Sequence, residues 1–378
     1  MRKLVWPLFA LALATFLGAG AHAVDFLSSG YGNDSYQSQL SYDSFNLSVR
    51  KRMETMRIGS VGQSFGTRRF NTASMFSSDE ALAMAPSSRY DAGNNSYRRR
   101  QLDCVYYSGF TVWGDLYQTW SRQRDRGDDD GYKSRVFGPA VGFDWTSGPV
   151  TLGIATTYNW GKIKSRDFHH DRKTRTWGLE AYGQYNSDLF YVNATLGYGH
   201  TTFRSDRNIS WNHSDRYSSN AVNLDGEFGW KFNFGGLQVT PHAGFRYFHD
   251  RRGSINEGGA NFDIHASTRN YHTFELPLGV DVGYEINTGG MIFVPRARFG
   301  WTPELSRKRG GASGTYRVGG NTFRYSDNTA RRNRHQFNVG LGLEAKITKT
   351  LSAHIDYNCN FRSRLYEHHW NLGMGFSF

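Results

Sequence analysis

Residues 274–286 read FELPLGVDVGYEI, a stretch in which apolar side chains alternate with polar or small ones. The apolar positions are Phe274, Leu276, Leu278, Val280, Val282, Tyr284 and Ile286. The positions between them include the carboxylates Glu275, Asp281 and Glu285. Successive side chains of a strand point to opposite faces, so this period of two predicts a β-strand with one apolar and one charged face. Residues 222–232 and 351–362 alternate in the same way.

Two kinds of sheet fit this alternation. In a soluble sandwich the apolar faces point into a core, whereas in an outer-membrane barrel they point into lipid and the polar faces line the lumen. The polar faces carry full charges along whole strands, such as Arg296 and Arg298. The strands are also ~10 to 14 residues long, which suits a tilted membrane crossing better than a typical soluble strand. Both observations favour the barrel.

Twelve such segments follow one another from residue 109 to the end of the chain. They run over 109–121, 133–146, 150–162, 174–186, 189–203, 219–233, 237–249, 270–286, 291–303, 334–346, 351–362 and 367–378. Short turns alternate with long connections, which lie at 122–132, 163–173, 204–218, 250–269 and 304–333. Tight periplasmic turns and longer external loops are typical of outer-membrane barrels. The even count places both ends of the barrel on the periplasmic side.

The composition is unusual in combining many aromatic residues with a polar average. Of 378 residues, 27 are Phe, 22 Tyr and 10 Trp, while the mean hydropathy is −0.62. These values exclude a bundle of membrane-spanning helices and a disordered chain. In a barrel, lipid covers the aromatic side chains. Those expected in girdles near strand ends are Trp145, Trp160, Trp177, Tyr185, Trp230, Trp301 and Trp370.

The N-terminus predicts export. A basic start (MRK) precedes an uncharged apolar stretch over residues 4–20, and the small residues Ala21 and Ala23 then form a cleavage pattern. These are the three regions of a signal peptide, so we expect residues 1–23 to be removed and the mature chain to start at Val24 with a net charge of +10. The alternative is a single membrane anchor, for which the stretch is at the lower limit of length.

Four segments carry a resemblance to a known family. They are VWGD (112–115), GPAVGFDW (138–145), LGIA (152–155) and GMGFSF (373–378). In order and spacing, the region from about residue 105 onward resembles the C-terminal translocator domain of the autotransporters. The resemblance implies a 12-stranded antiparallel transmembrane β-barrel over residues 108–378 in a Gram-negative outer membrane.

The resemblance also implies a sorting signal in the last strand. The family presents this strand, with its C-terminal aromatic residue, to the barrel-assembly machinery. The positions that would carry the signal are Trp370, Leu372, Met374, Phe376 and Phe378.

The family places an α-helix in the barrel lumen, and residues 44–57 are our candidate. Phe45, Val49, Met53 and Met56 recur at helical spacing. The basic residues of this segment are Arg50, Lys51, Arg52 and Arg57. The acidic residues expected to face the lumen are Asp144, Glu180, Asp225, Glu227, Glu275, Asp281, Glu285, Glu344 and Asp356. We expect charge pairs to hold the basic helix in this acidic lumen and to plug it; the alternative is an ordinary solvated amphipathic helix.

The chain departs from the family in three ways. Relatives that cleave themselves do so between two adjacent Asn residues in this helix, whereas Leu47 and Ser48 occupy the matching positions, so we expect no self-cleavage. The segment 24–43 is too short for a folded passenger, which suggests a vestigial one. The linker 58–107 is longer than the family usually has, and the sequence assigns it no role.

Basic residues gather in the expected external loops. In and around the loop 304–333 they are Arg307, Lys308, Arg309, Arg317, Arg324, Arg331, Arg332 and Arg334. A second cluster contains Lys164, Arg166, Arg172, Lys173 and Arg175. We interpret this charge as a complement to the phosphates of lipopolysaccharide, with host-glycan binding and a plain solvated surface as alternatives.

The sequence therefore favours a membrane anchor and translocation pore. A stand-alone adhesin-like surface barrel and an outer-membrane hydrolase are the other hypotheses. The sequence has no Ser/His/Asp order, paired-carboxylate signature or Gly-rich phosphate loop, so we expect no enzyme, cofactor or metal site. We expect a monomer, free thiols at Cys104 and Cys359, and no nucleic-acid partner.

Overall fold

The computed structural model describes residues 34–59 and most of the chain from 109 to 378. The described ranges are 34–59, 109–124, 131–165, 170–209, 211–259, 262–288, 290–308, 311–318, 321–328 and 333–378. The predicted signal peptide with its cleavage residues Ala21 and Ala23, most of the predicted linker, and Cys104 lie outside these ranges.

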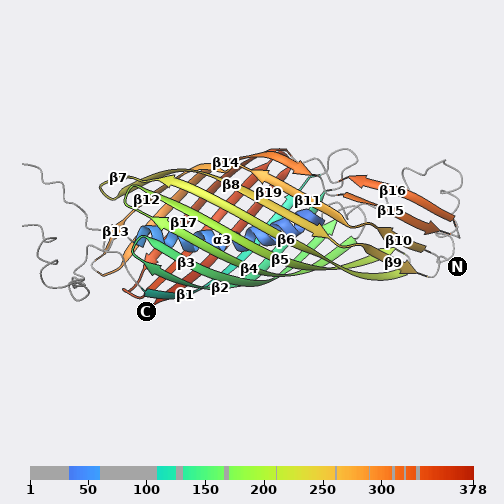
Figure 1. The fold of residues 1–378 in the computed structure, drawn as a ribbon, viewed down its shortest axis with the longest axis horizontal. Coiled ribbons are helices and arrows are strands. Elements are labelled where there is room, and N and C mark those ends of the chain that lie inside the picture. The colour runs from blue at the N-terminus through green and yellow to red at the C-terminus, as the bar shows by residue number, and fades with distance from the viewer. Residues whose placement is uncertain are drawn as a thin grey trace, which may run out of the picture.

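The strands form a closed antiparallel barrel (Figure 1). Its strands are β1 Gly109–Gln123, β2 Tyr132–Ser147, β3 Val150–Ser165, β4 His170–Asn186, β5 Phe190–Ile209, β6 Trp211–Trp230, β8 Leu237–Arg252, β11 Arg269–Glu275 with β12 Leu278–Tyr284, β14 Ile292–Lys308, β17 His335–Lys346, β18 Leu351–Arg362 and β19 Leu365–Ser377. Each strand pairs with its neighbours in sequence, and β1 pairs with β19 to close the circle.

Strands β11 and β12 are two halves of one barrel strand. Both pair with β8 on one side and β14 on the other, and the register on β14 shifts at Glu275. Pro277 lies between the halves and has no N–H to donate, so a proline at a bulge explains the break. Counted this way, the barrel has twelve strands, which confirms the predicted fold class.

The two ends of the barrel differ. At one end, the turn end, tight turns join the strands, and Gly148 and Gly235 adopt positive φ angles of 57° and 65° there. The short strands β7 Phe232–Phe234 and β13 Ile286–Asn287 extend two of these turns. At the other, the hairpin end, a separate four-stranded sheet projects beyond the barrel (Figure 1). It consists of β9 Ile255–Gly259, β10 Phe262–Ala266, β15 Gly311–Val318 and β16 Asn321–Asn328.

Three of the long connections that the sequence predicts contain strands of their own. The segment 204–218 largely continues β5 and β6, while 250–269 and 304–333 contain most of the projecting sheet. Beyond the membrane both faces of a hairpin contact water. No apolar face then marks such strands in the sequence.

Inside the barrel the two faces of each strand are sharply different. On β2 the outward Phe137, Val141, Phe143 and Trp145 are 40–53% exposed, whereas the inward Asp144 is fully buried. The seven expected girdle aromatics are 39–47% exposed and point outward. Lipid, rather than a protein core, is thus the environment that the apolar face suits.

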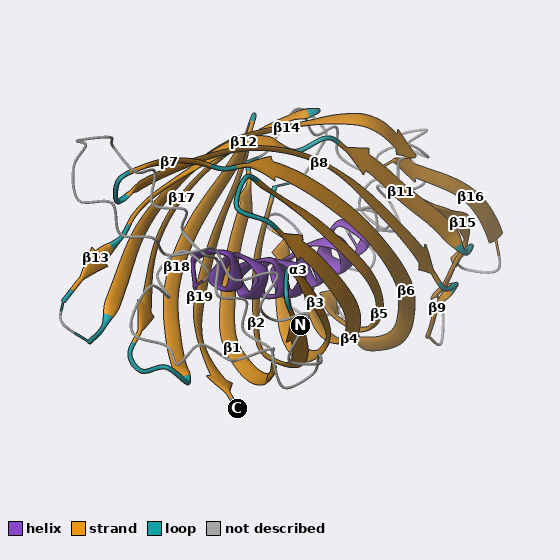
Figure 2. Ribbon diagram, turned by 60° about the vertical axis from the view of Figure 1, so that its left-hand side comes forward, coloured by secondary structure: helices purple, strands orange, loops and turns teal. Residues whose placement is uncertain are grey.

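The helix α3, Asp34–Gly59, lies in the lumen and contacts the barrel strands around it (Figure 2). It starts ten residues before the predicted 44–57, so much of the predicted segment 24–43 is helical. Residues 34–43, DSYQSQLSYD, are mostly polar, and only Tyr36, Leu40 and Tyr42 among them join buried clusters with wall side chains. Among the described residues, no helix is long and apolar enough to cross a membrane.

Glycines on the inner wall make room for two aromatic rings of α3. A Cβ atom on Gly197 of β5 would lie 1.3 Å from the Tyr42 hydroxyl oxygen, and one on Gly178 of β4 would lie 3.2 Å from the Phe45 ring. The Tyr42 hydroxyl in turn donates a hydrogen bond of 2.8 Å to Glu180. The absent side chain at Gly197 therefore sets how closely the helix approaches the wall.

We expect Gly197→Ala to lower the thermal unfolding midpoint of the folded protein in detergent. The new methyl group displaces Tyr42 from Glu180, and leaving a buried polar group without its hydrogen bond costs about 1–3 kcal/mol. Gly114→Ala is the matched control, because its Cβ would meet its nearest atom at 3.8 Å. Equal midpoints for the two variants would contradict this account of helix packing.

Candidate functional site

The candidate site is the contact zone between α3 and the lumen wall. Its best-defined ion pair joins Arg52 of the helix to Asp144 of β2 through two hydrogen bonds of 2.8 and 3.0 Å. Asp144 also accepts a 2.9 Å hydrogen bond from Tyr182, whose hydroxyl accepts one from Trp113. Two parallel N–H···O bonds between an arginine and a carboxylate are both strong and directional. This pair therefore fixes the rotation of the helix as well as its position.

A second cluster surrounds Glu54, an acid on the otherwise basic part of the helix. Lys51 bridges Asp356 of β18 at 2.8 Å and Glu54 at 3.2 Å. Glu54 also pairs with Arg298 and, at 3.3 Å, with Arg296 of β14. The helix thus supplies charges of both signs. Sequence reasoning missed Glu54, although the inward arginines of β14 were a signal that the lumen also needed an acid.

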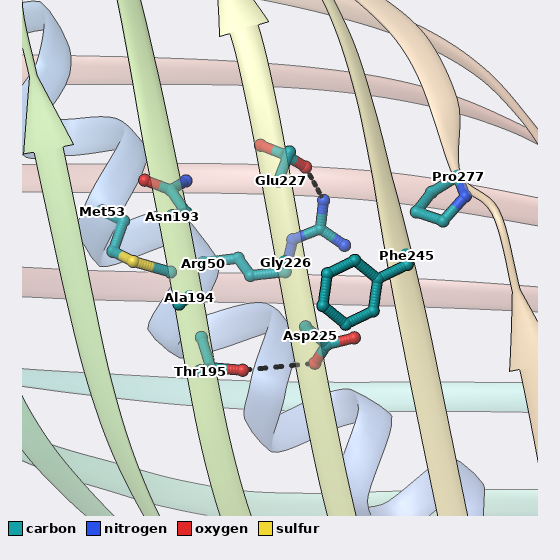
Figure 3. A pocket seen from close by; sticks show the side chains of 10 residues that line it. All are labelled: Arg50, Met53, Asn193, Ala194, Thr195, Asp225, Gly226, Glu227, Phe245 and Pro277. Carbon is teal, nitrogen blue, oxygen red and sulfur yellow. Dashed lines mark hydrogen bonds and ion pairs between the residues drawn. The ribbon is translucent and has the colours of Figure 1, made fainter.

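A third cluster lies near the end of the helix. Arg50 pairs with Glu227 of β6 (Figure 3), and Arg57 lies 3.6 Å from the same carboxylate. The Arg57 guanidinium also stacks 3.6 Å from the centre of the Tyr191 ring, and Tyr191 donates a 2.8 Å hydrogen bond to Glu227. Arg50 and Arg57, one on each side of Glu54, therefore both reach one carboxylate of the wall.

The other predicted lumen acids do not bind helix cations in the expected way. Glu180 and Asp225 share the Asn46 amide, which donates 2.9 Å hydrogen bonds to both. Wall arginines, rather than the helix, neutralise Asp225, Glu275, Asp281 and Glu344. Glu285 is half-buried beyond the end of β12. The acids and arginines of neighbouring strands face one lumen, so many of them pair within the wall.

The first turn of the helix is anchored at the hairpin end. Asp34 pairs with Arg172 of β4, lies 3.7 Å from Arg252 of β8, and accepts a 2.8 Å hydrogen bond from Tyr217 of β6. A carboxylate is also favourable at a helix N-terminus. The contacts at Asp34 and Arg57 give α3 a direction, from the hairpin end towards the turn end. Sequence reasoning missed Asp34 because it placed this residue outside the helix.

Little space is left beside the helix. One void of about 80 Å³ lies between α3 and the wall near Asp43, His242 and Arg246, and another of about 30 Å³ lies beside Glu54 and Arg57. A smaller one, of about 10 Å³, lies beside Arg50 and Met53 (Figure 3). One water needs roughly 10–15 Å³ of such volume. These voids hold a few waters at most, so the described part of the lumen is occupied by the helix.

The described residues contain no cluster of three or more His, Cys, Asp or Glu side chains that could hold a metal ion. Adjacent His368 and His369 point to opposite faces of β19. His369 forms a 2.9 Å hydrogen bond with Thr119 in the lumen, and His368 forms one of 2.7 Å with Tyr357 on the outer face. Cys359 is a free thiol.

The remaining predicted residues lie at the two ends of the barrel. The sorting-signal positions Trp370, Leu372, Met374, Phe376 and Phe378 are 44–64% exposed on the outside at the last strand. Arg307 is not an external-loop residue, since it lies in β14 and pairs with the buried Glu304. Arg334 is exposed and directly precedes β17, and Lys308 is the last residue of β14. Arg309, Arg331 and Arg332 lie outside the described residues.

A comparison with protein families identifies this architecture. The family described as "Autotransporter beta-domain" matches residues 112–358. The chain belongs to this family. Its barrel is therefore that of an autotransporter, an outer-membrane translocator domain, with tight turns facing the periplasm and hairpins facing outward.

Curated relatives are distant and much longer. Outer membrane protein A of Rickettsia rickettsii is 24% identical over 274 residues, which are 68% of this chain and 12% of that protein. The extracellular serine protease of Serratia marcescens is 23% identical over 243 residues, or 61% of this chain and 23% of that protein. This autotransporter chain thus spans less than a quarter of the length of either relative.

Solved translocator domains share the fold. The domain of NalP from Neisseria meningitidis has a TM-score of 0.58 at 16% identity and covers 72% of this chain and 90% of its own. The β-domain of Bordetella BrkA has a TM-score of 0.55 at 15% identity, covering 71% and 100%. That of AIDA-I from Escherichia coli has a TM-score of 0.53 at 13% identity, covering 76% and 93%.

We expect Arg52→Met to destabilise the folded protein by about 3–5 kcal/mol, because it leaves the Asp144 carboxylate buried without its cation. Adding Asp144→Asn removes that charge and recovers most of the loss. The free energies of unfolding come from urea titrations of the refolded autotransporter in detergent.

The matched control is Lys162→Met, which breaks an ion pair with Asp171 of 2.8 Å whose side chains are 43% and 38% exposed. Exposed pairs contribute less than about 1 kcal/mol. A loss for Arg52→Met no greater than for Lys162→Met, or no recovery in the double variant, would contradict the role given to Arg52.

Proposed function

We propose that this chain is a membrane anchor and translocation pore that is closed, after export, by its own helix. The single observation that carries the proposal is the direction of α3, which is anchored at Asp34 on the outer side and at Arg57 on the periplasmic side. Chain preceding Asp34 then emerges outside the cell, so the helix lies along the path that an exported segment would follow. The proposal assigns the barrel no enzymatic step.

The polar lumen supports both halves of this role. While the helix is absent, a lumen lined by charged and hydroxyl side chains admits water and an extended polypeptide. When the helix forms, these groups find partners on it, and 26 residues at 1.5 Å each extend about 39 Å. That length exceeds the hydrocarbon thickness of a bilayer. The same side chains thus serve an open state and a closed state.

The N-terminal residues have two roles in this proposal, export of the chain and exposure of a short segment outside the cell. We propose that a signal peptide cleaved after Ala23 directs export of the chain. Cleavage there would leave residues 24–33 ahead of the helix, and such a short displayed segment would be a vestigial passenger. Mass spectrometry of the mature protein identifies the first residue directly.

Deleting residues 34–59 is expected to raise the single-channel conductance in planar bilayers, because it opens a water-filled lumen. Deleting residues 60–85 removes the same length of chain after the helix and is expected to leave the conductance at the wild-type value. Conductance that does not change when the helix is removed would refute the plug.

An epitope inserted between Ser29 and Gly30 is expected to bind antibody on intact cells, because the helix runs inward from this point. The same epitope inserted between Gly235 and Gly236, in a tight turn, is expected to bind only after the outer membrane is permeabilised. If the first epitope also needs permeabilisation, the assigned direction of the chain is wrong.

A further inference from the structure

A row of basic side chains crosses the outer wall of the barrel near the hairpin end. Arg135 of β2 lies opposite Lys162 of β3, which lies opposite Lys173 of β4. Lys173 lies opposite Arg204 of β5, and Arg204 lies opposite Arg216 of β6. All five point away from the lumen; Lys162 is half-exposed and the other four are exposed. Five neighbouring strands thus present one cation each at the same level, which we call the cation row.

More basic side chains flank the cation row. Arg122, Lys133 and Lys164 form a parallel row on β1, β2 and β3, where each lies opposite the next. Asp171 is the one acid among the outward side chains described at this end of β1–β6, and it pairs with Lys162 at 2.8 Å. The described part of this surface therefore has a strong positive net charge.

The cation row lies directly outside the upper aromatic girdle. On β3, Trp160 is the outward residue before Lys162, and it lies opposite Arg175 of β4. Below Arg175 on β4 the outward side chains run from Trp177 to Tyr185. These eight steps of ~3.3 Å on a strand tilted by ~40° cover about 20 Å, close to the height of the apolar band of such barrels. The row therefore lies at the level of the lipid headgroups in the outer leaflet.

Like charges at directly opposite positions of a sheet are destabilising. The cation row contains four such pairs in succession. A ligand with several anionic groups suits neighbouring cations of this kind, and phosphate accepts paired hydrogen bonds from arginine. Arg135 also stacks on the ring of Trp120 at 5.9 Å, which holds its guanidinium at the surface. The arrangement suits a ligand that carries several phosphates.

We propose that this wall of the barrel binds the phosphorylated glycolipid of the outer leaflet, lipopolysaccharide. The exposed apolar side chains below the cation row argue for a lipid ligand rather than a free phosphate. Phe137, Trp160, Trp177 and Leu179 are exposed just below the row, so one molecule places phosphates on the cations and acyl chains on these side chains. Sequence analysis assigned this partner to the basic residues of the loop 304–333 and to a second cluster that includes Lys164 and Lys173; the proposed surface keeps Lys173 and extends across β2–β6.

The test is a titration of the refolded full chain in detergent with purified lipopolysaccharide, with and without its lipid phosphates. The variant Arg135→Gln/Lys162→Gln/Lys173→Gln/Arg204→Gln is expected to bind at least ~10-fold more weakly, since each cation near an anionic lipid surface adds to the attraction. The control Arg317→Gln/Arg324→Gln/Arg334→Gln/Lys349→Gln removes the same charge elsewhere and is expected to bind as the wild type does. Unchanged single-channel conductance shows that each variant is folded and plugged.

Three results would overturn the proposal. An equal loss of binding in both variants would mean a general charge effect. Equal binding of dephosphorylated lipopolysaccharide would mean that phosphate is not recognised. Soluble pyrophosphate that competes at the dissociation constant of the lipid would mean that acyl chains contribute nothing. All three outcomes leave the pore function standing, because that function is tested by conductance and epitope exposure.

Discussion

Closure of the sheet is the constraint on which this structure depends. In hydrocarbon, an unpaired backbone N–H or C=O costs several kcal/mol, so a membrane-spanning sheet cannot keep free edges. Pairing of β1 with β19 along Thr111 to Gln123 satisfies both edges. It also encloses an inner face that water, and not lipid, must solvate. The polar lumen, and through it the composition of the helix, follow from this one pairing.

The helix is shaped by that lumen. Like a helix on an ordinary protein surface, α3 buries one apolar stripe, because Phe45, Val49 and Met53 lie in one buried cluster with Trp113, Tyr117 and Tyr182 of the wall. Its other faces carry charged and amide side chains that need polar partners. Burying its charges costs several kcal/mol per ion unless each finds a partner. Arg52 and Glu54, with side chains 8% and 5% exposed, have theirs on β2 and β14. The pairs therefore specify which helix fits and in which rotation, even where they add little net stability.

This difference explains what the sequence could and could not predict. The twelve barrel strands were predictable, because lipid and lumen impose a period of two, as between Val141 and Asp144. The extended hairpins and the first turns of α3 were not, because only scattered apolar side chains such as Leu40 and Ile255 mark their buried faces. The sequence also could not predict which cation pairs with which lumen acid. Arg362 of β18 pairs with Glu275 of β11 and Glu304 of β14, and strand order alone does not specify such contacts across the lumen.

A single strand of this wall passes through three environments, and its side chains change at each boundary. On β4, the exposed side chains run from Tyr185 at the turn end through Leu179 in the apolar band to Lys173 beyond the upper girdle, while Glu180 is buried on the lumen face. The two membrane surfaces are treated differently. Above the upper girdle the strands continue with outward cations, whereas below the lower girdle they end in tight turns. Outward cations at one end and tight turns at the other therefore make the outer wall chemically asymmetric along the barrel axis, which is the contrast that the proposed binding of an anionic outer leaflet would use.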